Sequence, residues 1–310
     1  MLPLYKRLGM SPLIMACLMM LASGIMNLTP WGGPTARAAS ALQVDPSDVF
    51  VPMILPMLFA IGWLYFLGFM YGRMERKRLG IMELDISHGD NIQISNNPEA
   101  NRAHLRWFNG LLTVVLMICL VKGVLPMPIL FMVALCIALL VNYRDIDMQK
   151  DLVAHHAGSA LNVVGIIFAA GIFTGLLTGT GMVDSMSKEL VAIIPDSMGP
   201  FLAPITAVLS MPLTFFMSND AFYYGVLPIL SEAAGHYGIE PVEMARAAIV
   251  GQPVHLLSPL VPSTYLLCGL AGIEFGQHQK FTIKWAIITC FVMLIAALVF
   301  GMFPFYSVAT

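Results

Sequence analysis

Long apolar stretches separated by short polar ones recur along nearly the whole of this 310-residue chain. Several are long enough to cross the roughly 30 Å hydrocarbon core of a bilayer as helices. Charged residues make up only 11% of the chain, against about 25% in a typical soluble domain. A soluble fold could not cover so much apolar surface, so the sequence predicts an all-α polytopic membrane protein with the lipid bilayer as its partner.

The apolar stretches predict two membrane parts joined by a linker. Residues 1–80 are expected to hold an interrupted helix at 11–41 and a span at 49–72. The basic cluster at 73–78 directly follows that span, which places the linker, residues 81–106, in the cytoplasm. The remaining part, residues 107–310, is expected to hold spans at 107–121, 126–142 and 157–178, a re-entrant hairpin at 199–235, an interrupted helix at 243–271 and a span at 283–306.

The two parts contain an internal repeat with an offset of about 225–229 residues. Each copy begins with Leu-Pro, continues through an apolar helix, breaks at a motif rich in proline and threonine, and ends in a full span. The breaks lie at 27–35 (NLTPWGGPT) and 252–264 (QPVHLLSPLVPST). An odd number of predicted crossings separates the copies, so they are inserted in opposite orientations. Inverted repeats with interrupted helices are typical of secondary transporters.

Each break frees backbone amides and carbonyls at membrane depth, because proline lacks an N–H and glycine loosens the helix. Such groups are tolerated only where they line protein or a cavity, and the N-termini of the half-helices attract carboxylates. The breaks therefore predict a substrate site, and the alternative is a pair of kinks that only shape packing. The substrate-binding candidates are Asn27, Thr29, Pro30, Gly32, Gly33, Thr35 and Arg37 in the first break and Gln252, Ser258, Pro259, Ser263 and Thr264 in the second.

A polar tripeptide, Ser218-Asn219-Asp220, interrupts the apolar run of the predicted hairpin. Ser218 and Asn219 join the substrate-binding candidates. A carboxylate at membrane depth is a functional candidate by default, and Asp220 is predicted to couple transport to an ion or proton, unless it lies in an aqueous loop. His255 could share that role or be a satisfied core histidine. Arg37 could pair with a carboxylate or anchor the chain at the membrane interface.

Several other classes of protein are disfavoured. The five cysteines lie in apolar runs without metal-ligand spacing, and neither a phosphate-binding loop nor a dinucleotide fingerprint is present, so an ion gradient must supply the energy. The net charge of −2 implies no nucleic-acid partner. A membrane-embedded enzyme would need a nucleophile–base pair or a metal cluster, and the sequence shows neither. An Ala-rich stretch at 36–41 resembles a signal-peptide cleavage site, which leaves a secreted protein as another alternative.

Three motifs resemble the citrate–divalent-metal:proton symporter family of the ion transporter superfamily: LPLYKRLGMSP…MNLTPWGGPTARAA, FFMSNDAFYYGVLP and GQPVHLLSPLVPSTYLL. The resemblance covers nearly the whole chain. It implies uptake of citrate complexed with Mg²⁺ or Ca²⁺ in symport with protons, with the metal arriving as part of the substrate and no further cofactor. The runner-up is another carboxylate or oxyanion carrier of the same superfamily.

The same resemblance implies a multi-pass homodimer in the plasma membrane, with a scaffold domain and a transport domain that moves like an elevator. It matches Ser218, Asn219 and Asp220 to a hairpin tip. Related dicarboxylate carriers have Ser-Asn-Thr there, and the change to Asp220 suits a proton or a metal-complexed substrate. Both the resemblance and the repeat symmetry also predict a first hairpin upstream of Met1, and hence an N-terminally truncated chain.

Overall fold

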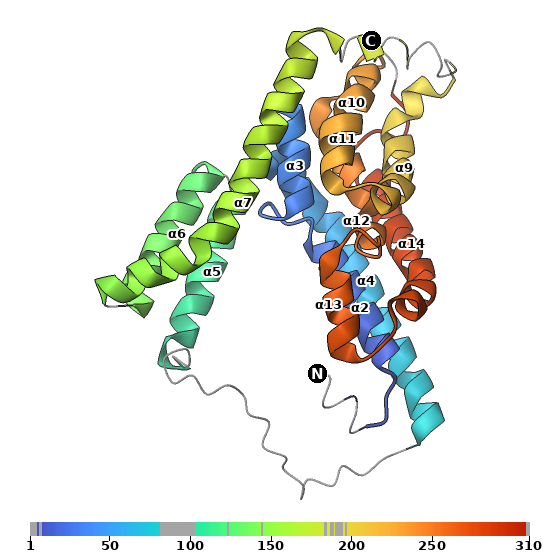
Figure 1. Ribbon diagram of the computed structural model, residues 1–310. Helices are drawn as coiled ribbons and strands as arrows, with labels where there is room; N and C mark the ends of the chain where they lie inside the picture. Colours follow the sequence, from blue (N-terminus) through green and yellow to red (C-terminus); the bar gives the residue numbers. More distant parts are fainter. Residues whose placement is uncertain are drawn as a thin grey trace, which may run out of the picture. The chain divides into compact units, whose positions relative to one another are not determined.

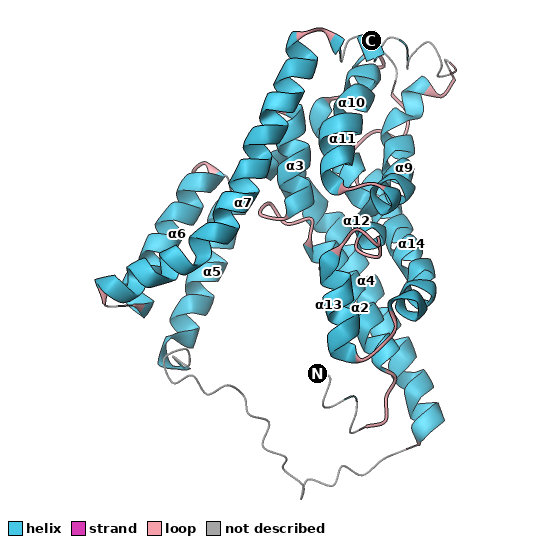
Figure 2. Cartoon of the chain, in the orientation of Figure 1, coloured by secondary structure: helices cyan, strands magenta, loops and turns pink. Residues whose placement is uncertain are grey.

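The computed structural model describes residues 5, 8–80, 103–122, 124–143, 145–182, 185–186, 189, 195 and 197–307. In this part of the chain the regular elements are all helices (Figure 2). The chain divides into two compact units, Met1–Met82 with Ile167–Thr310, and Glu83–Ile166. The first unit thus combines segments of both predicted repeats. Most of the predicted linker, residues 81–102, lies outside the described residues.

The first predicted interrupted helix is present as two helices, α2 (Pro12–Met26) and α3 (Gly33–Leu42). Both have proline in the first turn, where its missing N–H removes no intrahelical bond. The long helix α4 (Pro46–Leu79) follows, and the side chain of its N-cap, Asp45, accepts a bond from the Ser47 amide. The predicted break therefore lies where proline and glycine cluster.

The second repeat contains a helical hairpin and another interrupted helix (Figure 1). The hairpin comprises η2 (Gly199–Phe201), α9 (Leu202–Phe216), the π-helical turn η3 (Ala221–Val226) and α10 (Leu227–Gly235). The interrupted helix comprises α11 (Pro241–Ala248), η4 (Ile249–Gly251), α12 (Gln252–His255) and α13 (Pro262–Ala271), and α14 (Phe275–Val299) follows it.

Helix α14 contains most of the predicted span at 283–306. The helix begins at Phe275, in a polar stretch, and ends at Val299. One of the polar side chains in its first turns has a tertiary partner, because Gln279 donates a hydrogen bond to the carbonyl of Leu257. This contact supports a polar helix start that hydropathy does not indicate.

Helices α4 and α14, which occupy equivalent places in the two repeats, pack against each other and against α2. The ring centroids of Phe59 and Phe300 are 5.3 Å apart, and those of Tyr71 and Phe281 are 5.8 Å apart. Later residues of α4 thus meet earlier residues of α14, so the two helices run antiparallel. This is the relation that inverted repeats require.

Among the described residues, three helical segments are long and apolar enough to cross a membrane: Pro46–Leu79, Gly199–Phe216 and Phe275–Val299. Shorter apolar helices lie at Pro12–Met26, Arg106–Leu120 and Pro128–Asn142. The chain is an all-α polytopic membrane protein. The first arm of the predicted re-entrant hairpin, Gly199–Phe216, is long enough to span, and its re-entry stays a prediction.

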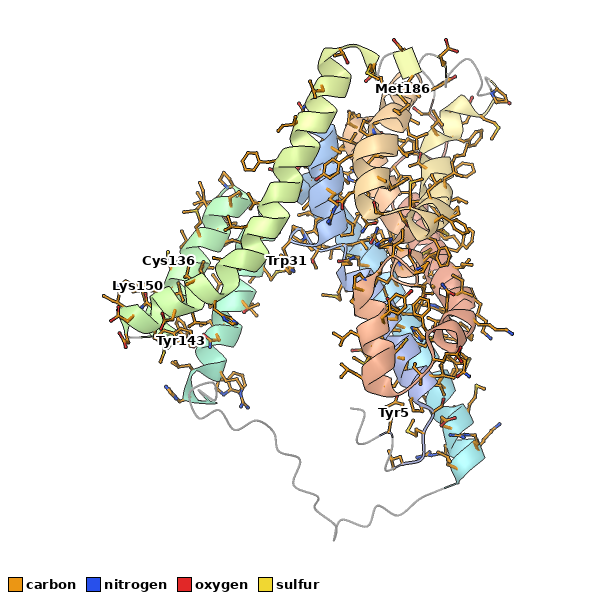
Figure 3. The ribbon with its side chains drawn as sticks, in the orientation of Figure 1. Tyr5, Trp31, Cys136, Tyr143, Lys150 and Met186 are labelled. Carbon is orange, nitrogen blue, oxygen red and sulfur yellow. The ribbon has the colours of Figure 1, made fainter. Side chains whose placement is uncertain are left out.

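The second unit contains η1 (Ala103–Leu105), α5 (Arg106–Val121), α6 (Met127–Asn142) and the first part of α7 (Ile146–Gly179), which continues into the first unit. The side-chain amides of Asn109 and Asn142 donate to each other's oxygens at 2.9 and 2.8 Å. This reciprocal pair joins α5 to α6. Cys136, labelled in Figure 3, lies on the exposed face of α6.

Candidate functional site

The two interrupted helices touch at equivalent positions of the repeat. The Asn27 side chain donates to the Gln252 side-chain oxygen at 3.2 Å, and these residues are 225 positions apart, within the offset of the repeat. Nearby, a Cβ on Gly24 would lie only 2.6 Å from Pro253 Cα. Contacts between equivalent residues arise where a two-fold axis passes, so the pseudo-symmetry axis runs through this crossing of α2 and α12.

Threonine hydroxyls close both breaks in the same way. Thr35 donates to the carbonyl of Leu28 at 2.8 Å, and its counterpart Thr264 donates to the carbonyl of Leu256. Both threonines are fully buried. Each hydroxyl thus satisfies a carbonyl released by the break, as buried polar groups require. These two predicted site residues hold the shape of the breaks.

Two further hydroxyls of the predicted set also donate to backbone carbonyls. Thr29 donates to Met26 at 3.0 Å within the first break. Ser258, in the second break, donates to the carbonyl of Phe215 at 2.7 Å. That bond ties the second break to the end of α9, next to the hairpin tip.

Gln252 connects the crossing to the hairpin tip. Its side-chain amide donates to the Asn219 side-chain oxygen at 3.3 Å and to the Tyr223 hydroxyl at 2.8 Å. Gln252 and Tyr223 are fully buried. Together with the Asn27 bond, one glutamine joins both interrupted helices and the hairpin, which makes this amide network the centre of the candidate site.

Tyr223 is a site residue that the sequence-based prediction missed. It lies in η3, the π-helical turn that directly follows the tip. Such turns occur frequently at functional sites. The signal was present, because a polar aromatic residue four positions after Asn219 falls on the same face of a helix. At the start of this segment, the Ser218 hydroxyl accepts a bond from the Ala221 amide at 3.1 Å.

Arg37 and Asp220 form an ion pair, with Nε and Oδ1 2.6 Å apart. The pair joins α3 to the hairpin tip. Arg37 therefore pairs with a carboxylate, which is one of the two alternatives that the sequence left open. The side chains are 25% and 44% exposed, respectively. The guanidinium also lies against the first residue of α3, since a Cβ on Gly33 would be 2.3 Å from Arg37 Nη1. Positive charge is therefore concentrated at the N-terminal end of α3, where the helix dipole adds to it.

His255 anchors the second interrupted helix to the first arm of the hairpin. Its Nδ1 lies 2.6 Å from the carbonyl oxygen of Thr214. A carbonyl only accepts, so Nδ1 carries the proton and donates. The residue is buried, with 7% of its surface exposed, and its part in proton coupling stays a prediction.

The remaining candidates lie around this network without a polar side-chain contact to it among the described residues. Pro30 and Gly32 are buried in the first break, whereas Pro259 and Ser263 are exposed in the second. A Cβ on Gly32 would lie 1.9 Å from the carbonyl oxygen of Asn27. Gly32 is therefore needed for the close approach of the backbone within the break.

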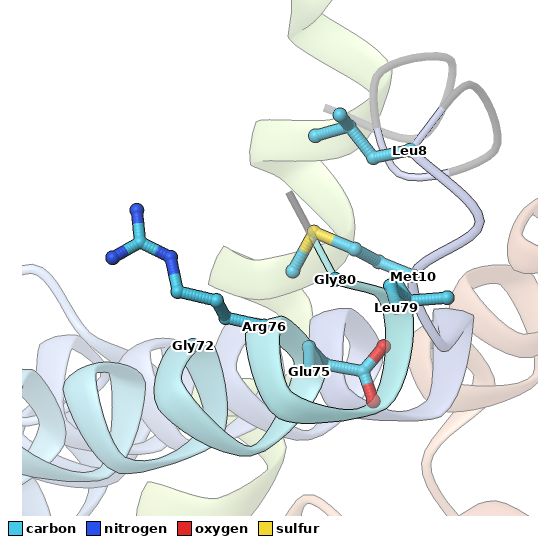
Figure 4. A pocket seen from close by; sticks show the side chains of 7 residues that line it. All are labelled: Leu8, Met10, Gly72, Glu75, Arg76, Leu79 and Gly80. Carbon is cyan, nitrogen blue, oxygen red and sulfur yellow. The ribbon is translucent and has the colours of Figure 1, made fainter. Parts of the chain in front are cut away.

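A separate cavity of about 300 Å³ lies near the end of α4 (Figure 4). Leu8, Met10, Glu75 and Arg76 are among its lining residues. The Glu75 carboxylate accepts a bond from the Ser11 amide and pairs with Arg78 at 2.6 Å. These contacts attach the start of α2 to α4, and the sequence-predicted site residues line none of this cavity.

The described residues contain no group of three or more His, Cys, Asp or Glu side chains that could hold a metal ion. The candidate site instead offers amides, one carboxylate and one guanidinium. Such a set can bind both anionic and cationic groups of a ligand.

Comparison with known proteins identifies the family. The sequence model of the citrate transporter family matches residues 1–251. The chain belongs to the citrate transporter family. A Bacillus subtilis protein named citrate transporter is 57% identical over 308 residues, covering 98% of this chain and 71% of the relative.

Two further Bacillus subtilis relatives support the same family. The Mg(2+)/citrate complex secondary transporter is 48% identical over 302 residues, 97% of this chain and 70% of its own length. The uncharacterized transporter YraO is 47% identical over 309 residues, with 97% and 70% covered. The predicted family is thus confirmed, and as a citrate transporter family member the chain is a transport protein.

Proposed function

We propose that this protein takes up citrate complexed with Mg²⁺ or Ca²⁺ in symport with protons. The observation that carries the proposal is the Arg37–Asp220 ion pair beside the crossing of the interrupted helices. A guanidinium at a helix N-terminus suits a carboxylate, and a carboxylate oxygen suits a divalent cation. The Mg(2+)/citrate transporter named among the relatives supports the choice of substrate.

Metal chelation makes citrate easier to transfer into this site. Binding one divalent cation lowers the charge of citrate from about −3 to −1, which reduces the desolvation penalty. Asp220 and His255 are the proposed ion- and proton-coupling residues, because Asp220 is the one carboxylate of the predicted site set and His255 is its one histidine.

The proposal includes the cellular setting. The protein is expected to be a multi-pass protein of the plasma membrane and a homodimer. Cross-linking in native membranes, followed by mass measurement, tests the dimer. Detection of only the single-chain mass after cross-linking would contradict it.

Uptake of labelled citrate by proteoliposomes tests the transport activity. We expect uptake with Mg²⁺ or Ca²⁺, at least about tenfold less with a chelator, and loss of concentrative uptake when a protonophore collapses the gradient. Competition with unlabelled dicarboxylates, lactate and oxyanions, with and without metal, tests the other carriers of the superfamily. Equal uptake in the chelator would contradict the metal-complex substrate.

A further inference from the structure

The Arg37–Asp220 pair has the geometry of a contact that a ligand can replace. Both side chains are partly exposed, at 25% and 44%. Within the described residues the pair is joined by a single hydrogen bond, from Nε to Oδ1. The Nη groups of Arg37 and Oδ2 of Asp220 are therefore left to make the first contact with an incoming ligand.

Charge balance limits which ligand can open this pair. A free polycarboxylate could bind Arg37, but it would leave Asp220 unpaired beside further negative charge. A free divalent cation could bind Asp220, but it would leave Arg37 unpaired beside further positive charge. An unpaired charge in a partly dehydrated site is unfavourable, and the penalty is moderate here because both side chains are partly exposed. Either ion alone therefore loses much of the free energy that it gains by binding, because it leaves one protein charge unpaired.

A metal–carboxylate complex avoids this loss because it carries both charges. Its carboxylate can accept bonds from the Arg37 guanidinium, which lies against the start of α3 at Gly33. The Asp220 carboxylate can coordinate its metal, directly or through a bound water, since divalent cations prefer oxygen ligands. Both protein charges then have a new partner at the same time.

We propose that the Arg37–Asp220 ion pair selects the metal–citrate complex over either free ion by exchanging partners with it. In the exchange, Arg37 transfers to a citrate carboxylate and Asp220, as a deprotonated carboxylate, transfers to the metal, which leaves His255 to hold the coupled proton. This inference rests on the proposed function and adds the origin of its metal requirement. The amide network of Asn27, Asn219 and Gln252 holds the hairpin tip and the breaks in place around the pair.

Binding of labelled citrate to the purified protein, with excess Mg²⁺ or with chelator, tests the exchange. Citrate should bind to the original protein about tenfold more tightly with Mg²⁺ than with chelator, because solvent screens part of the charge of this partly exposed pair. In Asp220→Asn, Arg37 is free, so citrate should bind in chelator and the preference should fall to about twofold or less. A matched control is Asp147→Asn, which removes the carboxylate of the exposed Lys150–Asp147 pair in the other unit and should leave the preference unchanged.

The complementary variant is Arg37→Gln, in which Asp220 is free. Calorimetry should then show binding of Mg²⁺ alone, and labelled citrate should bind poorly in both conditions. This variant decides the question if Asp220→Asn does not yield monodisperse protein. Retention of the full metal preference in Asp220→Asn, or no Mg²⁺ binding by Arg37→Gln, overturns the exchange while citrate binding by the original protein stands. No Mg²⁺–citrate binding by the original protein overturns the proposed function as well.

Discussion

At the scale of single residues, two adjacent glycines of the first break have different neighbours. A side chain on Gly33 would meet the end of the flexible Arg37 side chain, 2.3 Å from Nη1. A side chain on Gly32 would meet backbone, with the Asn27 carbonyl oxygen at 1.9 Å. The end of a side chain can move, whereas a packed backbone cannot. Gly33 therefore leaves room for the Arg37 side chain of the ion pair, and Gly32 allows the close approach of the backbone within the break.

Substitution of the two glycines should therefore give different results. Gly33→Ala should displace Arg37 and weaken binding of the metal–citrate complex about tenfold or more, with little change in thermal stability. Gly32→Ala should lower stability by about 2 kcal/mol or more through backbone strain. Thermal unfolding in detergent and citrate binding, measured on both variants, check this. Equal stability losses in the two variants would show that the glycines have the same role.

At the scale of elements, the breaks are built alike although their sequences differ in length. Thr35 and Thr264 each donate to a carbonyl just beyond the preceding half-helix, at Leu28 and Leu256. A buried carbonyl without a partner is unfavourable, so the hydroxyl makes each break tolerable. Each break is therefore stabilised by a hydrogen bond to a released carbonyl and is more than a simple kink.

Replacing either threonine by valine keeps the shape of the side chain and removes its donor. Thr35→Val and Thr264→Val should each lower the free energy of unfolding by about 1–3 kcal/mol, since a buried carbonyl loses its partner. Thr113→Val is the control, because Thr113 donates to the Asn109 carbonyl at an exposed position of α5. Chemical or thermal unfolding checks the series. A control loss as large as that at the breaks would argue against this role.

At the scale of the whole molecule, the crossing of α2 and α12 brings the two repeats together. Gly24 and Pro253 meet there without room for a side chain. The rest of this unit packs around the same axis, with α4 and α14 running antiparallel. The site therefore lies where equivalent halves of the repeat meet.

Enlarging Gly24 should push the two interrupted helices apart. Gly24→Ala should destabilise the protein by about 1–3 kcal/mol, the usual range for overpacking, and should reduce citrate binding. Gly269→Ala in α13 is the matched control, because its Cβ would meet no atom within 4 Å, and it should be neutral or stabilising by up to about 1 kcal/mol. Thermal unfolding of both variants checks this. A stable Gly24→Ala variant with normal binding would show that the contact is dispensable.

The sequence by itself determined the membrane class, both helix breaks and the family. These depend on local properties, namely apolar length, the effect of proline and glycine on helices, and specific motifs. It also identified Asn27, Asn219, Asp220 and Gln252 as polar site candidates beside apolar stretches. Hydropathy did not indicate that α14 begins at Phe275, because it does not show that Gln279 finds a partner at Leu257.

Only the tertiary structure decided which of these residues meet. Arg37 and Asp220 are 183 positions apart, and sequence alone left Arg37 equally suited to the membrane interface. The inverted packing brings α3 to the hairpin tip, pairs the two charges and adds Tyr223 to the network. Contacts between distant segments depend on how the helices pack around the repeat axis. That packing is stabilised by many weak contacts, and no local motif encodes them.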